Sequence, residues 1–205
     1  MKKRIVTMML AVLLALVYLA LPALATVYEY FPDVPDDAPY ADAVNMLAEM
    51  GIVKGDENGN FNPNNTITRA EFATMMCRLL GVEDAALAIT KSSFNDVPAD
   101  HWACGYVTKA VELGLVNGYG NGNFGPSDTL TYEQAVKVLV CAWGYEAEAT
   151  EKGGWPKGYA QIADEIGITK GTQIMGAESV NRSVVAALFY NAISIVPFDE
   201  IIDHE

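Results

Sequence analysis

Apolar residues recur at every third or fourth position in several stretches of the chain, which is the spacing of one face of an α-helix. The first stretch contains Ala43, Leu47 and Met50 and ends at Gly51, a residue suited to terminate a helix. Later stretches repeat the spacing at Phe72, Met75, Met76, Leu79 and Leu80, at Val107, Ala110, Val111 and Leu113, at Ala135, Val138, Leu139 and Ala142, and at Ile162, Ile166, Val185, Leu188, Phe189 and Ile193. The pattern predicts a mainly α chain in which helices alternate with turns.

Polar residues indicate where these helices begin and where the chain turns. Runs rich in glycine and asparagine occupy residues 55–60 and 118–123, a composition typical of turns. Thr68 followed three residues later by Glu71 predicts a capping box, so a helix is expected to begin after Thr68. Arg69 then takes the first helical position, where its charge faces the positive end of the helix dipole at a cost of about 0.3–1 kcal/mol. One of the few arginines is therefore placed where its own helix does not favour it.

The same short motifs occur twice in the same order, with a constant offset of 63 residues. The pairs are F-P-D-V-P at 31–35 and F-N-D-V-P at 94–98, G-I-V-K-G at 51–55 and G-L-V-N-G at 114–118, G-N-F-N-P at 59–63 and G-N-F-G-P at 122–126, and T-R-A-E at 68–71 and T-Y-E-Q at 131–134. A constant offset over several motifs indicates an internal repeat.

A weaker third copy follows the second. The landmarks that lie 53 residues apart are Trp102 and Trp155, Tyr106 and Tyr159, Gly114 and Gly167, and Gly118 and Gly171. Asn181-Arg182 lies only 50 residues after Thr131-Tyr132, so three residues are missing from the glycine-rich turn. The third copy also has no F-x-D-V start.

The copies predict repeat units at residues 29–82, 94–145 and 154–195, joined by small, polar and charged linkers at 83–93 and 146–154. A two-helix unit of this size cannot bury its own apolar face, so three units are expected to pack around a common axis. The expected fold is therefore mainly α, with three helix-turn-helix repeats packed as a pseudo-threefold bundle.

Residues 1–25 have the features of a secretory signal peptide. Basic residues at 2–4 precede an apolar stretch, and Ala23 and Ala25 form an A-x-A cleavage site. No cysteine follows the cleavage site directly, so a lipid anchor is not indicated, and no later apolar run reaches the roughly 20 residues of a membrane span. We expect an exported protein without membrane insertion after cleavage, ending in an acidic tail at 196–205.

Acidic residues dominate the composition. The chain has 13 Lys and Arg against 26 Asp and Glu, a net charge of −13, and cleavage after Ala25 would leave 10 against 26. This balance argues against nucleic acid and anionic lipid as partners, because both need basic patches that displace counterions. An anionic ligand can be held only at a focused site, so the sparse arginines are the residues to explain.

Some residue combinations imitate catalytic or metal sites without completing them. Residues 56–60 begin like a calcium loop, but Phe61 and Ile67 stand where that loop needs glycine and glutamate. His101 and Cys104 lie one helical turn apart, with no orienting partner or oxyanion motif. We therefore expect no catalytic residue, no metal and no cofactor.

The three cysteines, Cys77, Cys104 and Cys141, are an odd number for an exported chain. Cys77 and Cys141 fall among apolar helix residues, where a small buried thiol is the simpler interpretation. A disulfide remains an alternative.

The combination of F-x-D-V-P, H-W-A at 101–103, G-(I/L)-V-x-G, G-N-F-x-P and I-T-R-A-E resembles the S-layer homology module, in three consecutive copies over about residues 29–195. The resemblance implies three helical repeats with ligand grooves between neighbouring modules. Such modules anchor exported proteins to the bacterial envelope without covalent attachment, by binding secondary cell wall polymers, typically glycans with an acidic pyruvyl ketal. The implied location is the cell wall or surface layer, and the implied partner is a secondary cell wall polymer linked to peptidoglycan.

The resemblance also implies site residues. In the family, the arginine of T-R-A-E is a chief contact to the acidic group, and the aspartate of F-x-D-V and the glycine turns also line grooves. We expect the N–H groups at the helix N-terminus to add to the anion site. The residues expected to bind the polymer are Arg69, Asp33, Gly55, Asp96, Gly118, Trp102 and Arg182.

The later copies depart from the motif. Tyr132 stands in the second copy where the arginine belongs. The third copy keeps Arg182 after a candidate cap, Asn181, but Val184 replaces the capping glutamate. We therefore expect Arg69 to mark the better groove and Arg182 a second one.

Other interpretations remain for these residues and for the chain. Without the resemblance, pairing of Arg69 with Glu71 or Asp33 is the simpler interpretation, and Trp102 can pack between repeats as well as stack on a sugar. The chain can also be a structural surface-layer protein that self-assembles through its repeats, or the anchor end of a longer surface enzyme.

Overall fold

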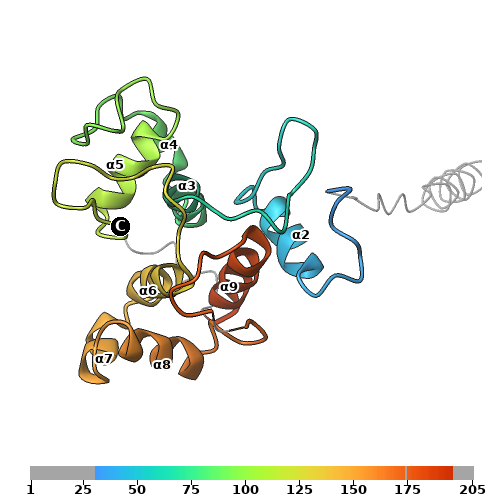
Figure 1. Cartoon of the computed structure of the whole chain (residues 1–205). Helices are drawn as coiled ribbons and strands as arrows, with labels where there is room; N and C mark the ends of the chain where they lie inside the picture. The colour runs from blue at the N-terminus through green and yellow to red at the C-terminus, as the bar shows by residue number, and fades with distance from the viewer. Residues whose placement is uncertain (1–30, 174, 196–205) are drawn as a thin grey trace, which may run out of the picture. The chain divides into compact units, whose positions relative to one another are not determined.

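The computed structural model describes residues 31–173 and 175–195, which belong to one compact unit (Figure 1). The predicted signal peptide and the acidic tail lie outside the described residues. In the part of the chain that is described, no helix is long and apolar enough to cross a membrane.

The described residues are mainly α-helical, which confirms the prediction from the apolar spacing. The helices are α2 (Ala41–Glu49), α3 (Arg69–Leu79), α4 (Glu83–Leu87), α5 (Cys104–Glu112), α6 (Tyr132–Ala142), α7 (Glu146–Glu151), α8 (Lys157–Glu165) and α9 (Arg182–Ile195). Three of them pair with the next long helix through a long turn: α2 with α3, α5 with α6, and α8 with α9. We name the connections turn 1 (51–67), turn 2 (114–130) and turn 3 (167–180).

The predicted helix ends are found in the structure. Gly51 and Gly114 follow α2 and α5 with φ of 71° and 72°, a backbone conformation that glycine adopts without strain. The capping boxes that form before α3 and α6 are Thr68 with Glu71 and Thr131 with Gln134. At the start of α9, Asn181 Oδ1 accepts a hydrogen bond from Val184 N–H at 2.9 Å, so Asn181 caps that helix.

Each helix pair packs on the next one, and the three contacts form a cycle. Helix α5 packs on α3, α8 packs on α6, and α2 packs on α9, so the first helix of each pair covers the second helix of another pair. Phe72 of α3 and Phe189 of α9 are fully buried and meet edge to face, with 5.4 Å between their ring centroids. Each pair therefore buries its apolar face against its neighbours and not within itself.

A closed ring of backbone hydrogen bonds joins the three turns. Ile67 N–H donates to Val180 O at 3.1 Å, and Val180 N–H donates to Leu130 O at 2.9 Å. Leu130 N–H closes the ring on Ile67 O at 2.9 Å. Because three equivalent bonds run in one direction around the cycle, the turns have the pseudo-threefold relation that the repeats predict.

The linkers are more ordered than their composition suggests. Helices α4 and α7 lie within 83–93 and 146–154, where only polar connections are expected from the sequence. A Cβ atom on Gly105 of α5 would clash with the carbonyl of Ala86, and one on Gly158 of α8 would clash with that of Ala149. The small residues of the linkers thus permit a close approach of helices, and the linkers contain short helices that the sequence analysis did not predict.

Candidate functional site

Arg69 lies at the junction between α3 and turn 2. Its Nε donates to Phe124 O at 3.0 Å, and its Nη2 donates to Asn117 O at 2.7 Å. The guanidinium carbon lies 4.5 Å from the ring centroid of Phe124 and 4.9 Å from that of Tyr119. With 9% of its surface exposed, Arg69 is a buried clamp between the first two repeats.

The pairing of Arg69 with Glu71 or Asp33 is not found. Among the described residues, the ion pairs are Arg78–Glu83, Lys109–Glu112 and Lys152–Glu165. Glu71 instead accepts a hydrogen bond from Thr68 N–H at 2.8 Å, as its place in the capping box requires.

The expectation of free N–H groups at the N-terminus of α3 is wrong. Arg69 N–H donates to Asp128 O at 2.9 Å, and Ala70 N–H donates to Pro126 O at 3.1 Å. The next N–H group belongs to the capping box. Carbonyl groups of turn 2 therefore occupy the N–H groups that would otherwise bind an anion at this helix end. The sequence of α3 alone does not predict this contact, because turn 2 belongs to another part of the chain.

Arg182 occupies the equivalent junction between α9 and turn 1. Its Nε donates to Phe61 O at 2.7 Å, and its Nη2 donates to Lys54 O at 3.2 Å. The guanidinium carbon lies 4.7 Å from the ring centroid of Phe61. Lys54 and Phe61 correspond to Asn117 and Phe124, so the two arginines hold their turns in the same way.

Arg182 is only half-buried, and its surroundings are acidic. Burial lowers the pKa of Arg182, while the carboxylates of Glu71, Asp33 and Asp56 oppose that shift. The guanidinium remains charged at neutral pH, because the ordinary pKa of arginine lies far above neutrality.

Two adjoining cavities, of about 230 and 250 Å³, lie beside Arg182. Both are lined by Lys54, Glu71 and Arg182. The first is also lined by Ile52, Val53, Thr74, Met75, Arg78 and Trp102, and the second by Gly55, Asp56, Asn60, Asn62, Asn65 and Thr66. We name the two cavities together the Arg182 groove.

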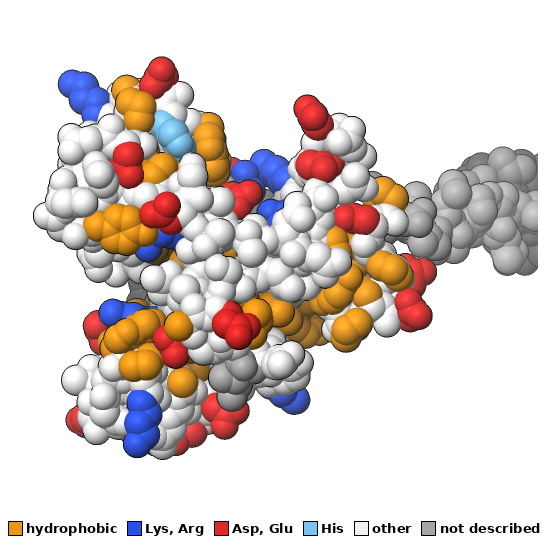
Figure 2. Space-filling model, viewed as in Figure 1, with side chains coloured by type: hydrophobic (Ala, Val, Ile, Leu, Met, Phe, Trp, Pro, Cys, Tyr) orange, Lys and Arg blue, Asp and Glu red, His pale blue; other side chains and the backbone are white. Residues whose placement is uncertain are grey.

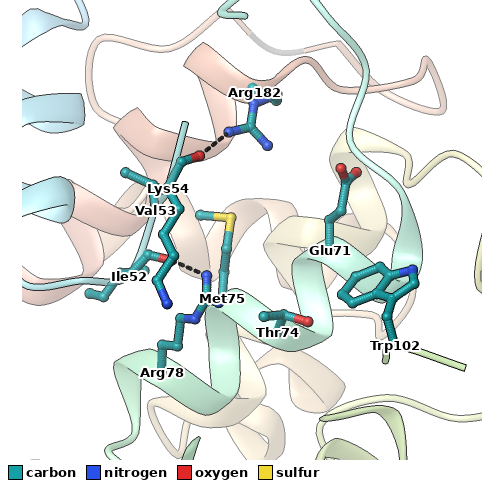
Figure 3. Close-up of a pocket in the computed structure, with 9 residues that line it drawn as sticks. All are labelled: Ile52, Val53, Lys54, Glu71, Thr74, Met75, Arg78, Trp102 and Arg182. Atoms are coloured by element: carbon teal, nitrogen blue, oxygen red, sulfur yellow. Dashed lines mark hydrogen bonds between the residues drawn. The ribbon is translucent and has the colours of Figure 1, made fainter. Parts of the chain in front are cut away.

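The first cavity combines an aromatic surface with positive charge. Figure 3 shows residues 52–54 on one side, Trp102 on the other and side chains of α3 between them. Trp102 is 59% exposed, and its ring stacks on His101 with 5.8 Å between centroids. An exposed indole beside a guanidinium can receive a sugar ring that carries a carboxylate.

Two of the cations at this cavity are accessible to a ligand. Arg78 Nη1 donates to Ile52 O at 3.3 Å (Figure 3). Its Nε donates to Glu83 Oε1 at 2.9 Å, so the Arg78 side chain is paired within the protein. Lys54 is exposed and Arg182 is half-buried, and neither is in an ion pair among the described residues, which leaves these two for an anion.

The aspartates of the F-x-D-V motifs bind the backbone of the turns. Each carboxylate accepts two N–H bonds, at 2.6–2.8 Å: Asp33 from Phe61 and Asn62, and Asp96 from Phe124 and Gly125. Burial raises the pKa of Asp96, but the donated N–H bonds outweigh burial and hold that pKa below its ordinary value.

Gly55 and Gly118 lie under phenylalanine rings. A Cβ atom on Gly55 would lie 3.0 Å from the ring of Phe31, and one on Gly118 would clash with the ring of Phe94. Glycine is therefore needed for packing at position 118 and fits a tight contact at position 55, and Gly55 also lines the second cavity.

The third junction has a tyrosine in place of arginine. Tyr132 is 2% exposed, and its hydroxyl group hydrogen-bonds Thr172 Oγ1 of turn 3 at 3.0 Å. This junction keeps a bond between repeats but offers no positive charge from Tyr132.

The calcium-like run is a turn. Asp56 Oδ1 accepts from Asn58 N–H at 2.8 Å and from Asn60 N–H at 2.9 Å, which occupies the carboxylate with its own backbone. Across residues 31–173 and 175–195, no group of three or more His, Cys, Asp or Glu side chains could hold a metal ion.

His101 and the cysteines have local structural roles. His101 Nδ1 accepts a hydrogen bond from Ala103 N–H at 3.1 Å where α5 begins. Cys77, Cys104 and Cys141 are all free, and burial raises the pKa of the Cys77 thiol to about 11. A thiol with that pKa is a weak nucleophile at neutral pH.

Sequence reasoning missed Lys54 in the Arg182 groove and Tyr119 over Arg69. Both stand at positions where the first two copies differ: Lys54 against Asn117, and Asp56 against Tyr119. They could have been identified from the positions where the two copies carry different residues. The residues that both copies share mostly form the backbone framework common to the repeats.

Comparison with known proteins identifies the repeats. Residues 30–73 and 93–136 match the S-layer homology domain. Each matched segment runs from the F-x-D-V motif into the second helix of its pair, α3 or α6.

Several curated proteins are similar over more of the chain. A cell surface protein of Thermoanaerobacter kivui is 36% identical over 167 residues, which are 80% of this chain and 21% of that protein. A surface layer protein of Brevibacillus choshinensis is 38% identical over 136 residues, which are 66% of this chain and 12% of that protein. An amylopullulanase of Thermoanaerobacterium thermosulfurigenes is 26% identical over 185 residues, which are 81% of this chain and 10% of that protein.

The chain thus spans about a fifth or less of the length of these relatives. The chain therefore carries S-layer homology domains at residues 30–73 and 93–136 and is a secreted protein of the bacterial cell wall or surface layer.

Proposed function

We propose that the chain holds itself, or a protein joined to it, at the cell wall by non-covalent binding of an acidic secondary cell wall polymer. An acidic substituent such as a pyruvyl ketal binds Arg182 and Lys54, and a sugar ring of the same polymer lies on Trp102. The observation that carries the proposal is the Arg182 groove, where a half-buried guanidinium, an exposed ammonium group and an exposed indole line the same space.

The charge distribution favours a small acidic group over a long polyanion. Acidic side chains are spread over the face shown in Figure 2, and basic ones are few. A polyanion would meet this negative field along its whole length, whereas one carboxylate on a sugar needs a single cationic pocket. Arginine suits that pocket because its planar guanidinium can bind a carboxylate through two parallel hydrogen bonds.

The proposed anchor consists of three S-layer homology repeats, at 29–82, 94–145 and 154–195, of which the third is degenerate. The cyclic packing of the helix pairs and the closed ring of backbone bonds support a third repeat. Arg182 comes from that repeat and meets turn 1, so the third repeat contributes to binding although its own turn meets Tyr132.

The other candidate residues take supporting places in this proposal. Asp33 and Asp96 hold turns 1 and 2, Gly55 forms part of the groove wall, and Gly118 is the equivalent residue of turn 2. Arg69 is the second candidate contact and ranks behind Arg182, because its guanidinium is buried against turn 2.

Cosedimentation with purified walls of the source bacterium tests the proposal. The exported protein is mixed with walls before and after chemical removal of the secondary polymer, as wild type and as Arg182→Ala. Wild type should pellet only with intact walls, and the variant should remain in the supernatant although its thermal unfolding midpoint falls by only about 2–4 °C. Pelleting that survives polymer removal would instead support the alternative function, in which the repeats assemble through protein contacts.

We further propose that the chain is non-catalytic and serves as the anchor end of a longer surface protein. The amylopullulanase and an exoglucanase of Acetivibrio thermocellus, 25% identical over 80% of this chain, support this, because this chain matches only 10% and 16% of their lengths. An immunoblot of wall extracts is the test. A band far above 22.1 kDa supports a larger protein, and a band at or below that mass contradicts it.

A further inference from the structure

The Arg69 and Arg182 junctions share a backbone framework, and among the positions where the two turns differ, three bear on access to the arginine. At an offset of 63 residues, the turn-1 and turn-2 pairs are Asp56 and Tyr119, Asn62 and Gly125, and Asn65 and Asp128. All three positions of turn 1 line the second cavity of the Arg182 groove.

In turn 1, short polar side chains bond to one another and leave space beside the arginine. Asn62 Nδ2 donates to Asp56 Oδ2 at 2.9 Å, which holds the two side chains together at the cavity wall. Arg182 keeps part of its surface accessible as a result.

In turn 2, the tyrosine ring lies over the arginine. The guanidinium carbon of Arg69 is 4.9 Å from the ring centroid of Tyr119, and the Tyr119 hydroxyl donates to Asp128 Oδ2 at 2.8 Å. A Cβ atom on Gly125 would lie 2.6 Å from the Tyr119 ring, so only glycine leaves room for it. The three differences act together: glycine gives space, aspartate fixes the hydroxyl, and the ring covers the cation.

We infer that Tyr119 closes the Arg69 groove, so that the chain binds one acidic saccharide, at Arg182, and that removal of the Tyr119 ring opens a second site. The Tyr119 ring lies against the Arg69 guanidinium, where a sugar ring would otherwise lie. It also stabilises the buried charge by a cation–π contact. This inference rests on the proposed function for the identity of the ligand.

Side-chain NMR can observe the two grooves separately. The Nε–H groups of Arg69 and Arg182 are both hydrogen-bonded to carbonyls, so each is expected to give its own resonance, assigned from Arg→Lys variants. The probe is a hexose carrying a pyruvyl ketal, with the same hexose lacking the ketal as control. In wild type, the probe should shift the Arg182 resonance alone. In Tyr119→Ala, both resonances should shift.

A second measurement on the same samples reports closure without any ligand. In Tyr119→Ala, exchange of the Arg69 Nε–H with water should accelerate by about tenfold or more, because the covering ring is gone. Tyr119→Phe keeps the ring but loses the bond to Asp128, so an intermediate exchange rate is expected. Unchanged exchange in Tyr119→Ala, or a wild-type Arg69 resonance that responds to the probe, would overturn the inference.

A reciprocal variant provides the matched test in turn 1. The triple variant Asp56→Tyr, Asn62→Gly, Asn65→Asp transfers the turn-2 side chains, and it should abolish the shift of the Arg182 resonance. If neither arginine of wild type responds to the probe while exchange at Arg69 still accelerates in Tyr119→Ala, the proposed ligand is wrong and closure by Tyr119 stands.

Discussion

Arg69 and Arg182 make the same local contacts in two different surroundings. Each arginine follows a helix cap, each donates from Nε to a phenylalanine carbonyl and from Nη2 to a second carbonyl, and each lies on that phenylalanine ring. The difference lies in the turn that each one meets. Tyr119 covers Arg69, whereas Arg182 lies beside two cavities.

A complete T-R-A-E motif therefore does not ensure that its arginine is accessible. The intact T-R-A-E before α3 meets turn 2, and Asn181-Arg182 before α9, which lacks the rest of that motif, meets turn 1. Each junction joins a helix of one pair to the turn of another pair, so the exposure of each arginine depends on that turn as well as on its own helix.

The largest expected effect is on stability, at the closed junction. Arg69→Ala removes two hydrogen bonds from a charged donor and leaves the carbonyls of Phe124 and Asn117 without this partner. The free energy of unfolding should fall by about 3 kcal/mol, since each bond to a charged group contributes about 1.5–3 kcal/mol before relaxation. Urea denaturation followed by circular dichroism measures the change. A loss below about 1 kcal/mol would show that Arg69 is not a structural clamp.

Asp96→Asn should have the next largest effect and should make stability less dependent on pH. The variant weakens two charge-assisted bonds to turn 2, so a loss of about 1–2 kcal/mol is expected at pH 7. Because the folded pKa of Asp96 lies below its unfolded value, its contribution is present above pH about 4 and is lost as pH falls through the folded pKa.

The pH prediction for Asp96 is checked by urea denaturation of wild type and variant at several pH values. The difference in unfolding free energy should shrink as the pH drops below about 4. A difference that is constant from pH 7 to about pH 2 would contradict a stabilising role for the ionised carboxylate.

Arg182→Ala should destabilise the protein less than Arg69→Ala, by about 1 kcal/mol, because its guanidinium is partly exposed and one of its bonds is longer. The two variants measured side by side in urea make the comparison quantitative. Equal losses would mean that the two junctions are energetically alike, and burial against turn 2 would then not distinguish them.

The smallest expected effect is the loss of wall binding when the aromatic side chain of the groove, Trp102, is removed. Trp102→Ala should weaken wall binding by about 1 kcal/mol, or roughly fivefold, since an aromatic contact contributes about 0.5–1.5 kcal/mol. Trp155 is the matched control, because it holds the equivalent position and is 47% exposed, with Lys137 Nζ 5.5 Å from its ring centroid. Trp155→Ala should leave wall binding unchanged, and equal losses from both variants would contradict a single accessible groove.

Much of the fold follows from local chemistry in the sequence. The apolar spacing, the capping boxes at Thr68 and Thr131 and the glycine at position 51 each depend on a few neighbouring residues, and the structure confirms them. The helices in the linkers were missed because they depend on close packing at Gly105 and Gly158, which a single stretch of sequence does not display.

The candidate site was harder to predict than the fold, for a physical reason. Arg182 and the carbonyl of Lys54 are 128 residues apart in the chain, and only the cyclic packing of the repeats brings them together. The same packing closes the N-terminus of α3 with carbonyls of turn 2, so a favourable helix end in the sequence is not a free anion site in the structure.

The most direct test is the dissociation constant for intact cell walls. It is measured for wild type, Arg69→Lys and Arg182→Lys in the same buffer, so that the two junctions are compared directly. Lysine keeps the charge but not the planar fork, so both proteins should fold and differ only in how the acidic group is held. We predict that Arg182→Lys weakens wall binding about tenfold or more, whereas Arg69→Lys binds as wild type does. Loss of binding in Arg69→Lys with full binding in Arg182→Lys would contradict the assignment of the polymer to the Arg182 groove.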